Sequence, residues 1–305
     1  MMPQCFAQLS DPHLSSLEHV RARDLLNKRA LGYLSWRRKR RFEHRPEVLA
    51  ALQRDLSGID LEQLLVTGDL THIGLPQEFE QARQWLQQLG DPREVALVPG
   101  NHDACVAAPW QTTFGLWQEY MAADDDSGAP ASATCFPTLR VRGTIAFIGL
   151  STACPKPPLM ATGTVDAGQL SRLPGLLDET GRKGLFRVVY LHHCPLQGQE
   201  KWRKRLTNAR QVQELLMQHG AELALHGHGH REHYNELETC HGVLPVIAVP
   251  SASALGLHGA DVARYNRYQV QRKEGGWQVR IDSRHFQPQS GEFGEGSSRL
   301  LELNR

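Results

Sequence analysis

The sequence predicts an α/β protein in which a mostly parallel β-sheet carries its functional loops at one edge. The first supporting observation lies within residues 1–121, where a short apolar stretch, a polar loop and a helical pattern follow one another three times. The second is a change after residue 230, where short apolar stretches succeed one another without long helices between them. This change indicates an antiparallel edge or a second sheet.

Composition limits the class of protein. The chain has 305 residues, of which 40% are hydrophobic and 22% charged, enough for a large core. A formal net charge of +1 argues against binding polyanions through overall charge. The six cysteines form no C-x-x-C pair, which argues against a cysteine zinc site and a disulfide framework. With no signal peptide and no apolar stretch near the roughly 20 residues of a membrane span, we expect a cytoplasmic protein.

The order of elements follows from the apolar and polar pattern. We expect strands at residues 5–9, 63–67, 94–98, 138–142, 144–149, 187–191 and 221–225, and then at 233–237, 243–249, 265–272 and 277–286. We expect helices at residues 46–56, 76–89, 110–121, 166–177 and 208–219. Pro46 suits the first turn of its helix, and Asn208 is a plausible N-cap. Residues 124–133 are expected to form an exposed loop. One domain would span residues 1–286, and the polar residues 287–305 would form a loose tail.

A histidine-rich turn follows the predicted strand at residues 221–225. In the segment 226–230, three imidazoles alternate with two glycines. Glycine allows a sharp turn, and imidazole is the commonest side-chain metal ligand. The sequence therefore favours a metal site here, with a solvated loop that happens to hold histidines as the alternative.

Four other predicted strands also end in potential ligands, and we expect all five strand ends to meet at the same edge of one sheet. These side chains are Asp11 and His13, Asp69, Asn101 and His102, and His192 or His193. For Asp11 and His13 alone, a polar turn is an equal alternative. The set offers oxygen and nitrogen without thiolate, which suits iron, manganese, zinc or nickel. Two cations sharing a carboxylate would lie about 3.5–4 Å apart, a spacing typical of phosphoester hydrolysis.

The motifs Asp-x-His, Gly-Asp, Gly-Asn-His-Asp, His-His and Gly-His-x-His occur in this order from about residue 6 to residue 230. As a set they resemble the calcineurin-like metallophosphoesterase superfamily. The segments 68–71 and 191–195 are most similar to its bacterial branch of cyclic-nucleotide and glycerophosphodiester phosphodiesterases. The resemblance implies a four-layer αββα sandwich of two mixed β-sheets flanked by helices.

The resemblance also implies a role for each matched residue. It implies two metal ions, which would be manganese, iron or zinc. The first ion would be held by Asp11, His13 and His230, and the second by Asn101, His192 and His228. Asp69 would bridge the two ions. His102 would face the phosphate, and Asp103 would orient His102. His192 is preferred to His193 because the family's ligand closes the strand, and His226 would be structural. A metal-bound hydroxide would be the nucleophile, so no catalytic Ser or Cys is needed.

One departure from the family pattern concerns His72. Many members have a second aspartate at this place, three residues after the bridging one. The position is not a metal ligand in the pattern, so metal binding is not affected. We expect local hydrogen bonding and substrate contact to differ.

An unusual segment at residues 17–45 separates the first motif from the rest. Leucines and aromatic residues recur at helical spacing, and five consecutive cations, residues 37–41, follow. The alternatives are a solvated helix packed by its leucines, an amphipathic contact of Leu25–Phe42 with an anionic membrane, and a phosphate-binding patch for nucleic acid. Because the insert leaves the loop of Asp11 and His13, it would overhang the site.

The function predicted is that of a metal-dependent phosphodiesterase. A cyclic nucleotide or other small diester is the default substrate that the resemblance implies. The alternative is a pyrophosphohydrolase of a UDP-diacylglucosamine type of lipid, peripheral at the inner membrane. A nuclease and a non-catalytic binding module are less favoured, because overall charge is neutral and every ligand position is filled.

Overall fold

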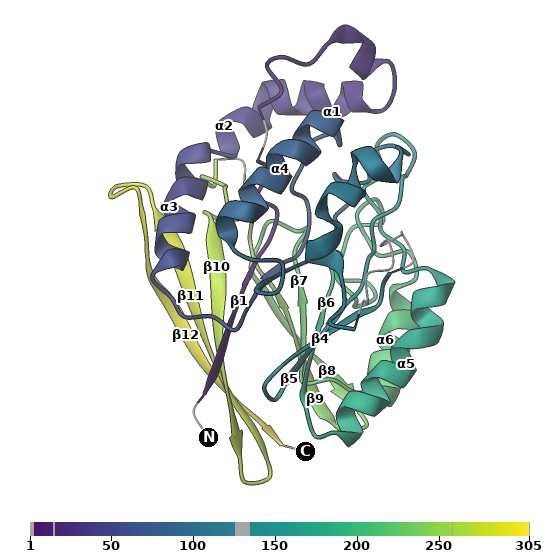
Figure 1. Ribbon diagram of the computed structural model, residues 1–305, viewed down its shortest axis with the longest axis vertical. Coiled ribbons are helices and arrows are strands. Elements are labelled where there is room, and N and C mark those ends of the chain that lie inside the picture. The colour runs from purple at the N-terminus through teal and green to yellow at the C-terminus, as the bar shows by residue number, and fades with distance from the viewer. Residues whose placement is uncertain (1–2, 15, 126–134, 258, 305) are drawn as a thin grey trace.

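The computed structural model describes residues 3–14, 16–125, 135–257 and 259–304. Two six-stranded mixed sheets pack face to face, and helices cover their outer faces (Figure 1). The first sheet has the strand order β12-β11-β10-β1-β2-β3, and the second has the order β4-β5-β6-β7-β9-β8. The predicted αββα sandwich is confirmed.

Parallel strands form one half of the first sheet and the centre of the second. In the first sheet, β1 (Gln4–Leu9), β2 (Gln63–Val66) and β3 (Val95–Leu97) run parallel. In the second, the parallel strands are β5 (Ile145–Gly149), β6 (Phe186–Tyr190), β7 (Leu223–His226) and β9 (Gly242–Ala248). Strands β5, β6 and β7 are buried along their whole length, as parallel strands covered on both faces must be.

Antiparallel strands form the other half of the first sheet and the two edges of the second. Strand β10 (Arg264–Lys273) pairs with β1, and β11 (Gly276–Gln287) and β12 (Glu292–Asn304) extend the same sheet outward. Strands β4 (Thr138–Arg142) and β8 (His233–Thr239) border the second sheet. The helix-poor end of the chain therefore completes both sheets.

Four amphipathic helices form the outer layers. They are α3 (Pro46–Ser57) and α4 (Pro76–Leu89) beside the first sheet, and α5 (Ala167–Arg182) and α6 (Ala209–His219) beside the second (Figure 1). Residues Trp110–Thr112 and Phe114–Met121 form 3₁₀ turns. Among the described residues, every helix is too short or too polar to span a bilayer.

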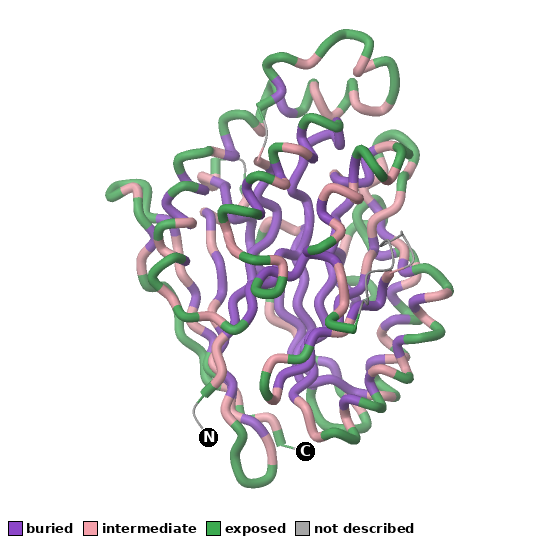
Figure 2. Tube along the Cα trace, viewed as in Figure 1, coloured by how far each residue is buried: buried purple, intermediate pink, exposed green. Residues whose placement is uncertain are grey.

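The core lies between the sheets, as the buried trace at the centre of Figure 2 shows. Phe6 of β1 stacks on Tyr268 with ring centroids 4.6 Å apart, and meets Phe147 of the second sheet edge-on at 5.1 Å. All three rings are buried. This contact joins the two sheets through β1, the strand that leads into the loop carrying Asp11 and His13.

The predicted loose tail at residues 287–305 is wrong, because residues Glu292–Asn304 form β12 and pair with β11 from Gln287↔Glu292 to Gly276↔Asn304. This strand lies at a sheet edge, and most of its side chains are exposed. A solvated edge strand needs no apolar pattern, so its polar composition resembled a tail.

Asn208 occupies the N-cap position of α6, as predicted, but its side chain does not cap the helix: it accepts from the Val165 N–H at 3.1 Å and donates to the Val165 carbonyl at 2.8 Å. It therefore fixes a neighbouring loop and leaves its own helix start without a side-chain cap. The loop predicted at residues 124–133 falls mostly outside the described residues.

Candidate metal centre

The candidate ligands come from the carboxyl ends of strands in two sheets, where a single sheet was expected. β1, β2 and β3 of the first sheet and β6 and β7 of the second end side by side. Gln8 on β1 links the two edges by donating to the His226 carbonyl at 3.0 Å. Alternating strands and helices look the same in either sheet, so the sequence pattern could not divide them.

Left-handed backbone turns bring the ligands together. Five predicted ligands have positive φ values between 45° and 68°: Asp11, His13, Asp69, His228 and His230. Non-glycine residues seldom adopt this conformation, and strained backbone of this kind gathers at functional sites. The turns allow His228 and His230, two positions apart, to face the same cluster, as the alternation of histidine and glycine predicts.

The first group of ligands surrounds Asp11. Ligand atoms of Asp11, His13 and Asp69 all lie within 4.8 Å of one another, and the Nε2 of His230 is 3.1 Å from Asp11 Oδ1. The Nδ1 of His13 bonds to the Thr71 carbonyl at 3.0 Å. Its Nε2 is buried and has no hydrogen-bond partner among the described residues.

The second group lies on the other side of Asp69. The Nε2 of His192 is 3.3 Å from Asp69 Oδ2 and 3.2 Å from Asn101 Oδ1. Its Nδ1 bonds to the Thr67 carbonyl at 2.7 Å, which fixes the ring. The Nε2 of His228 is buried and lacks a hydrogen-bond partner within the described part of the chain. Asp69 therefore lies between the two groups.

The choice between His192 and His193 has a geometric answer. Both ring nitrogens of His193 are engaged, Nδ1 with Thr152 Oγ1 at 2.7 Å and Nε2 with the Ala161 carbonyl at 3.1 Å. His193 also lies within ligand distance of His192 and His228. Only His192 directs a nitrogen at Asp69 and Asn101, so the geometry favours His192 as the ligand.

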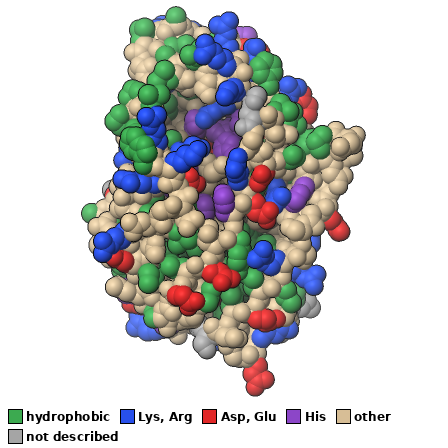
Figure 3. Space-filling model, turned by 180° about the vertical axis from the view of Figure 1, so that it is seen from behind, with side chains coloured by type: hydrophobic (Ala, Val, Ile, Leu, Met, Phe, Trp, Pro, Cys, Tyr) green, Lys and Arg blue, Asp and Glu red, His purple; other side chains and the backbone are tan. Residues whose placement is uncertain are grey.

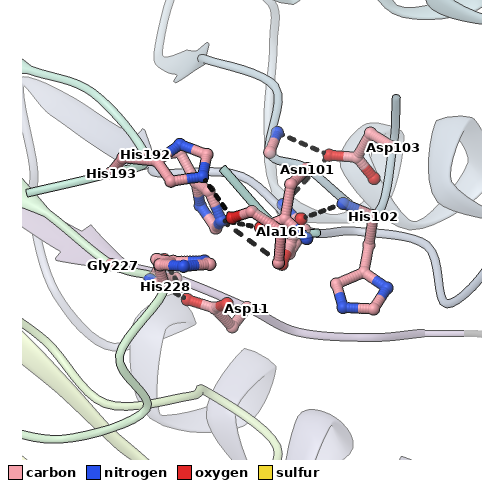
Figure 4. Close-up of polar contacts among 12 residues, drawn as sticks. Asp11, Asn101, His102, Asp103, Ala161, His192, His193, Gly227 and His228 are labelled. Atoms are coloured by element: carbon pink, nitrogen blue, oxygen red, sulfur yellow. Dashed lines mark hydrogen bonds and ion pairs between the residues drawn. The ribbon is translucent and has the colours of Figure 1, made fainter. Parts of the chain in front are cut away.

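The structure does not support the predicted role of Asp103 in orienting His102. The Asp103 carboxylate accepts from the backbone N–H groups of Asp69, Thr71 and Gly100, each at 2.9 Å. The His102 ring extends in the opposite direction from the loop (Figure 4), and its Nδ1 lies 2.6 Å from the His72 carbonyl. Asp103 thus ties together the two loops that carry Asp69 and Asn101, because their N–H groups converge on it.

His72 shows how the departure from the family pattern is accommodated. Its ring is buried and stacks on His13 with centroids 5.1 Å apart and planes inclined by 7°. Its backbone carbonyl bonds to His102 Nδ1, and its own Nδ1 has no hydrogen-bond partner among the described residues. His226, expected to be structural, is buried with its Nδ1 3.1 Å from the Gly227 carbonyl.

Electrostatics separates the charged groups from the neutral ones. Burial alone would raise the pKa of Asp69, but His192 and His102 hold it well below its usual value. Burial opposes a charge on His192, but the adjacent Asp69 carboxylate outweighs burial and raises the pKa of His192 to about 9. His192 and Asp69 thus form an ion pair when no cation is bound. Burial, reinforced by neighbouring imidazoles, holds the pKa values of His13 and His44 well below 6.5.

Sequence reasoning missed two side chains of the insert. Residues Arg29–Ser35 (α1), Trp36–Arg40 in a π-helical turn, and Arg41–Glu43 (α2) form nearly continuous helix over the site. The Nη1 of Arg40 lies 3.0 Å from His102 Nδ1, and the His44 ring centroid lies 4.5 Å from that of His13. Nothing in the sequence distinguishes Arg40 from its four cationic neighbours. The irregular helical turn, which decides where it points, has no sequence signal.

The insert is fixed to the domain by a small core of its own. Trp36 and Leu17 pack with Ile73, Leu75 and Cys105. Arg29 donates to the Ile73 and Gly74 carbonyls at 3.0 and 2.6 Å. The leucines of the insert are mostly outside this core. Trp36 and Leu17 therefore anchor the insert to the domain.

A cavity of about 660 Å³ opens over the ligands. Its floor includes Asp69, Asn101, His102, His228 and His230. Four of the cations around it are Lys39, Lys201, Lys204 and Arg231. Figure 3 shows histidines in the hollow and basic side chains at its rim. The surroundings suit an anion.

The residues present fit two cations. The unpartnered Nε2 atoms of His13 and His228 point into a site that also holds two carboxylates, and a buried polar atom without a partner is costly. In His13 and His192, the Nε2 faces the site and the Nδ1 is bonded to a backbone carbonyl. This is the usual support for a metal-bound histidine.

Comparison with known proteins agrees with this geometry. The family model described as calcineurin-like phosphoesterase matches residues 6–232. A 3',5'-cyclic-nucleotide phosphodiesterase from Nostoc sp. is 26% identical over 250 residues, which cover 79% of this chain and 76% of that protein. A dimetal phosphatase from Danio rerio superposes with a TM-score of 0.57 at 13% identity and full coverage of both chains. A purple acid phosphatase from yellow lupin (Lupinus luteus) seeds superposes with a TM-score of 0.56 at 11% identity, and the match covers 98% of this chain and 53% of that chain.

Proposed function

The chain belongs to the calcineurin-like phosphoesterase family, hydrolases of phosphoester bonds, and we propose that it is a phosphodiesterase acting on a small diester of the cyclic-nucleotide type. The observation that carries the proposal is the convergence of two groups of oxygen and nitrogen ligands on Asp69. The similarity to the Nostoc sp. phosphodiesterase supports a diester over a monoester.

The metal assignment uses the seven side chains described above. Asp11, His13 and His230 would hold one divalent cation, Asn101, His192 and His228 would hold the other, and Asp69 would be shared. Two bound cations would polarise the phosphoryl oxygens and make a water molecule more acidic. Manganese, iron and zinc all suit this donor set.

His102 is assigned to the leaving oxygen. A carbonyl only accepts, so the His102 Nδ1–H donates to His72 and the Nε2 is available on the other side of the ring. Burial, with the nearby Arg40 as the second cause, lowers the pKa of His102 to about 3. A bound phosphate anion would raise this pKa, and a protonated His102 would then donate a proton to the departing oxygen.

Arg40 is assigned to the phosphoryl charge. Its Nη1 faces His102 Nδ1, which already donates elsewhere, so this contact gives the guanidinium no acceptor. Among the described residues, no carboxylate forms an ion pair with Arg40. A partly buried guanidinium without a counterion favours an anionic ligand in the cavity.

The test is turnover of bis(p-nitrophenyl) phosphate by protein loaded with Mn²⁺, with p-nitrophenyl phosphate as the monoester reference. The diester should be hydrolysed faster, and Asp69→Asn should lower its kcat by more than about a hundredfold, since even outer-shell changes cost about 10–100-fold. Asp178→Asn, at an exposed site far from the cluster, should leave kcat unchanged. No turnover with any of manganese, iron or zinc would overturn the proposal.

A lipid-linked pyrophosphate is the second candidate substrate, in keeping with the UDP-diacylglucosamine type of enzyme. It is favoured by exposed apolar side chains on the insert, among them Leu26 at 84%, Leu31 at 46% and Phe42 at 45% exposure. They stand beside exposed cations in residues 37–41, a pattern suited to an anionic bilayer surface.

Vesicle binding separates the two candidates. The variant Leu26→Asp with Leu31→Asp should lose binding to phosphatidylglycerol vesicles and keep turnover of the soluble diester. Leu300→Asp changes a leucine of similar exposure, 55%, on β12 and should change neither property. Equal vesicle binding by wild type and the double variant would contradict a membrane contact through the insert. Hydrolysis of single-stranded DNA in the same panel tests the nuclease alternative.

A further inference from the structure

His44 lies at the end of the insert, where the chain is clamped to a neighbouring segment. It forms a β-bridge with Ala254, and its N–H donates to the Arg40 carbonyl at 2.9 Å. The flanking Arg45 N–H donates to the Ser253 carbonyl at 3.1 Å. The side chain is only 7% exposed. The backbone position of His44 is therefore fixed from both sides.

A serine pair fixes the ring of His44 as well. Its Nδ1 lies 2.8 Å from Ser253 Oγ and 3.4 Å from Ser251 Oγ. Ser251 Oγ in turn donates to the Asp11 carbonyl at 2.7 Å, which ties this support to the first ligand of the metal centre. With Nδ1 engaged, Nε2 is the nitrogen available to the cavity, whose wall His44 forms.

The free side of His44 faces the first cation site. Its ring centroid lies 4.5 Å from that of His13 and 5.6 Å from that of His230. One ligand nitrogen from each of the three rings lies within 4.8 Å of the others. Three nitrogens spread evenly around one ion at about 2.1 Å are about 3.6 Å apart, so a shift of roughly 1 Å would let all three bind one cation.

We infer that His44 is a further ligand of the first cation, supplied by the insert in addition to Asp11, His13, Asp69 and His230. The inference rests on the proposed metal centre and adds a side chain that the family's motifs do not include. The bond between Nδ1 and Ser253 is the kind of support that ligating histidines have in proteins. The first site would then hold three imidazoles and two carboxylates, a set that favours a transition metal over magnesium.

A metal ligand supplied by the insert would couple metal binding to the position of the insert over the cavity. The helical segment 29–43 contacts the domain through a small apolar cluster and a few hydrogen bonds to backbone carbonyls. A bond from His44 to the cation adds a tether at the end of this segment. Binding of the cation should therefore hold the insert, and Arg40 with it, over the cavity.

Metal titration tests the inference without relying on turnover. Metal-free wild type, His44→Ala and His233→Ala are titrated with Mn²⁺ by calorimetry, and the Co²⁺-loaded proteins are compared by visible absorption. His233 is the matched control, because it is an exposed histidine on the wall of the same cavity and outside the three-imidazole group. His44→Ala should weaken one of two bound ions by at least about tenfold and change the Co²⁺ spectrum, and His233→Ala should do neither.

Tryptic cleavage at residues 37–41 supplies a second readout. Mn²⁺ should slow cleavage of this exposed basic run in wild type and have no such effect in His44→Ala. If His44→Ala fails to fold, His44→Gln replaces it, since its amide can still bond to Ser253 and is a poorer ligand. Two ions bound by the variant with wild-type affinity, spectrum and protection would overturn the inference and leave the proposed function standing. A wild type that binds no Mn²⁺ would overturn both.

Discussion

Replacing Asp103 by alanine tests whether this carboxylate organises the ligand loops. It is 3% exposed and accepts from three backbone N–H groups and from Thr71 Oγ1. Removing it leaves three buried donors without an acceptor, at about 1–3 kcal/mol each. Water entering the vacated space limits the loss, so we expect unfolding to be easier by about 4 kcal/mol.

The same change can be expressed as a melting temperature. For 305 residues, an unfolding entropy of about 2.1 cal/mol/K per residue gives about 0.6 kcal/mol/K, so the metal-free variant should melt roughly 6 °C below wild type. Urea denaturation and scanning calorimetry measure both quantities. Asp178→Ala, which removes an aspartate that is 52% exposed, should lose less than about 1 kcal/mol.

The result that would refute this reasoning is an Asp103→Ala protein as stable as the Asp178→Ala control. If such a protein also lost diester turnover, Asp103 would act on the chemistry through His102 after all. A large loss of stability together with weakened Mn²⁺ binding is what loop clamping requires, since both loops carry ligands of the second cation.

Three other predictions address charge. Arg40→Ala should lower kcat for the chromogenic diester by about a hundredfold, because one preorganised charge-stabilising group is lost. Arg38→Ala, at an exposed site in the same basic run, should leave kcat unchanged. Equal steady-state rates for the two variants would contradict the role of Arg40. The pKa of His192 is raised to about 9 in the metal-free protein, and an imidazole must be neutral to bind a metal. Binding of Mn²⁺ at pH 7.5 should therefore release about one proton, and the affinity for Mn²⁺ should rise about tenfold per pH unit until pH 9. Calorimetry in buffers of different ionisation enthalpy measures the released proton, and a binding enthalpy that does not depend on the buffer would contradict the prediction. Arg187→Met should destabilise the protein by about 3–5 kcal/mol, because it removes the guanidinium of a buried ion pair from the Glu222 carboxylate. Arg187→Met with Glu222→Leu should recover most of this loss in chemical denaturation, and equal stability of the two variants would contradict the prediction.

The candidate ligands could be picked out from the sequence because each lies close to the end of an apolar strand. Asp11, Asp69 and His192 follow β1, β2 and β6 within three residues, and the carboxyl ends of parallel strands are where loops meet. The split of these strands between two sheets could not be predicted, since pairing partners depend on contacts far apart in the sequence. The strand β12 was missed because an exposed polar edge has no apolar period.

Side chains whose role depends on direction were harder to predict. Asp103 follows His102 directly, but it points back toward three N–H groups, which no spacing rule shows. Arg40 and His44 reach the site only because the insert folds back over it and is held at residues 251–255. Such long-range placement is a property of tertiary packing and has no local signal.

Anomalous diffraction from crystals soaked in Mn²⁺ tests the central claim most directly, because it counts the cations and places them. We predict two peaks about 3.5–4 Å apart, on either side of the Asp69 carboxylate. One would be bounded by Asp11, His13 and His230, and the other by Asn101, His192 and His228. The account would be contradicted by crystals with no peak at Asp69, or with a single ion bound elsewhere.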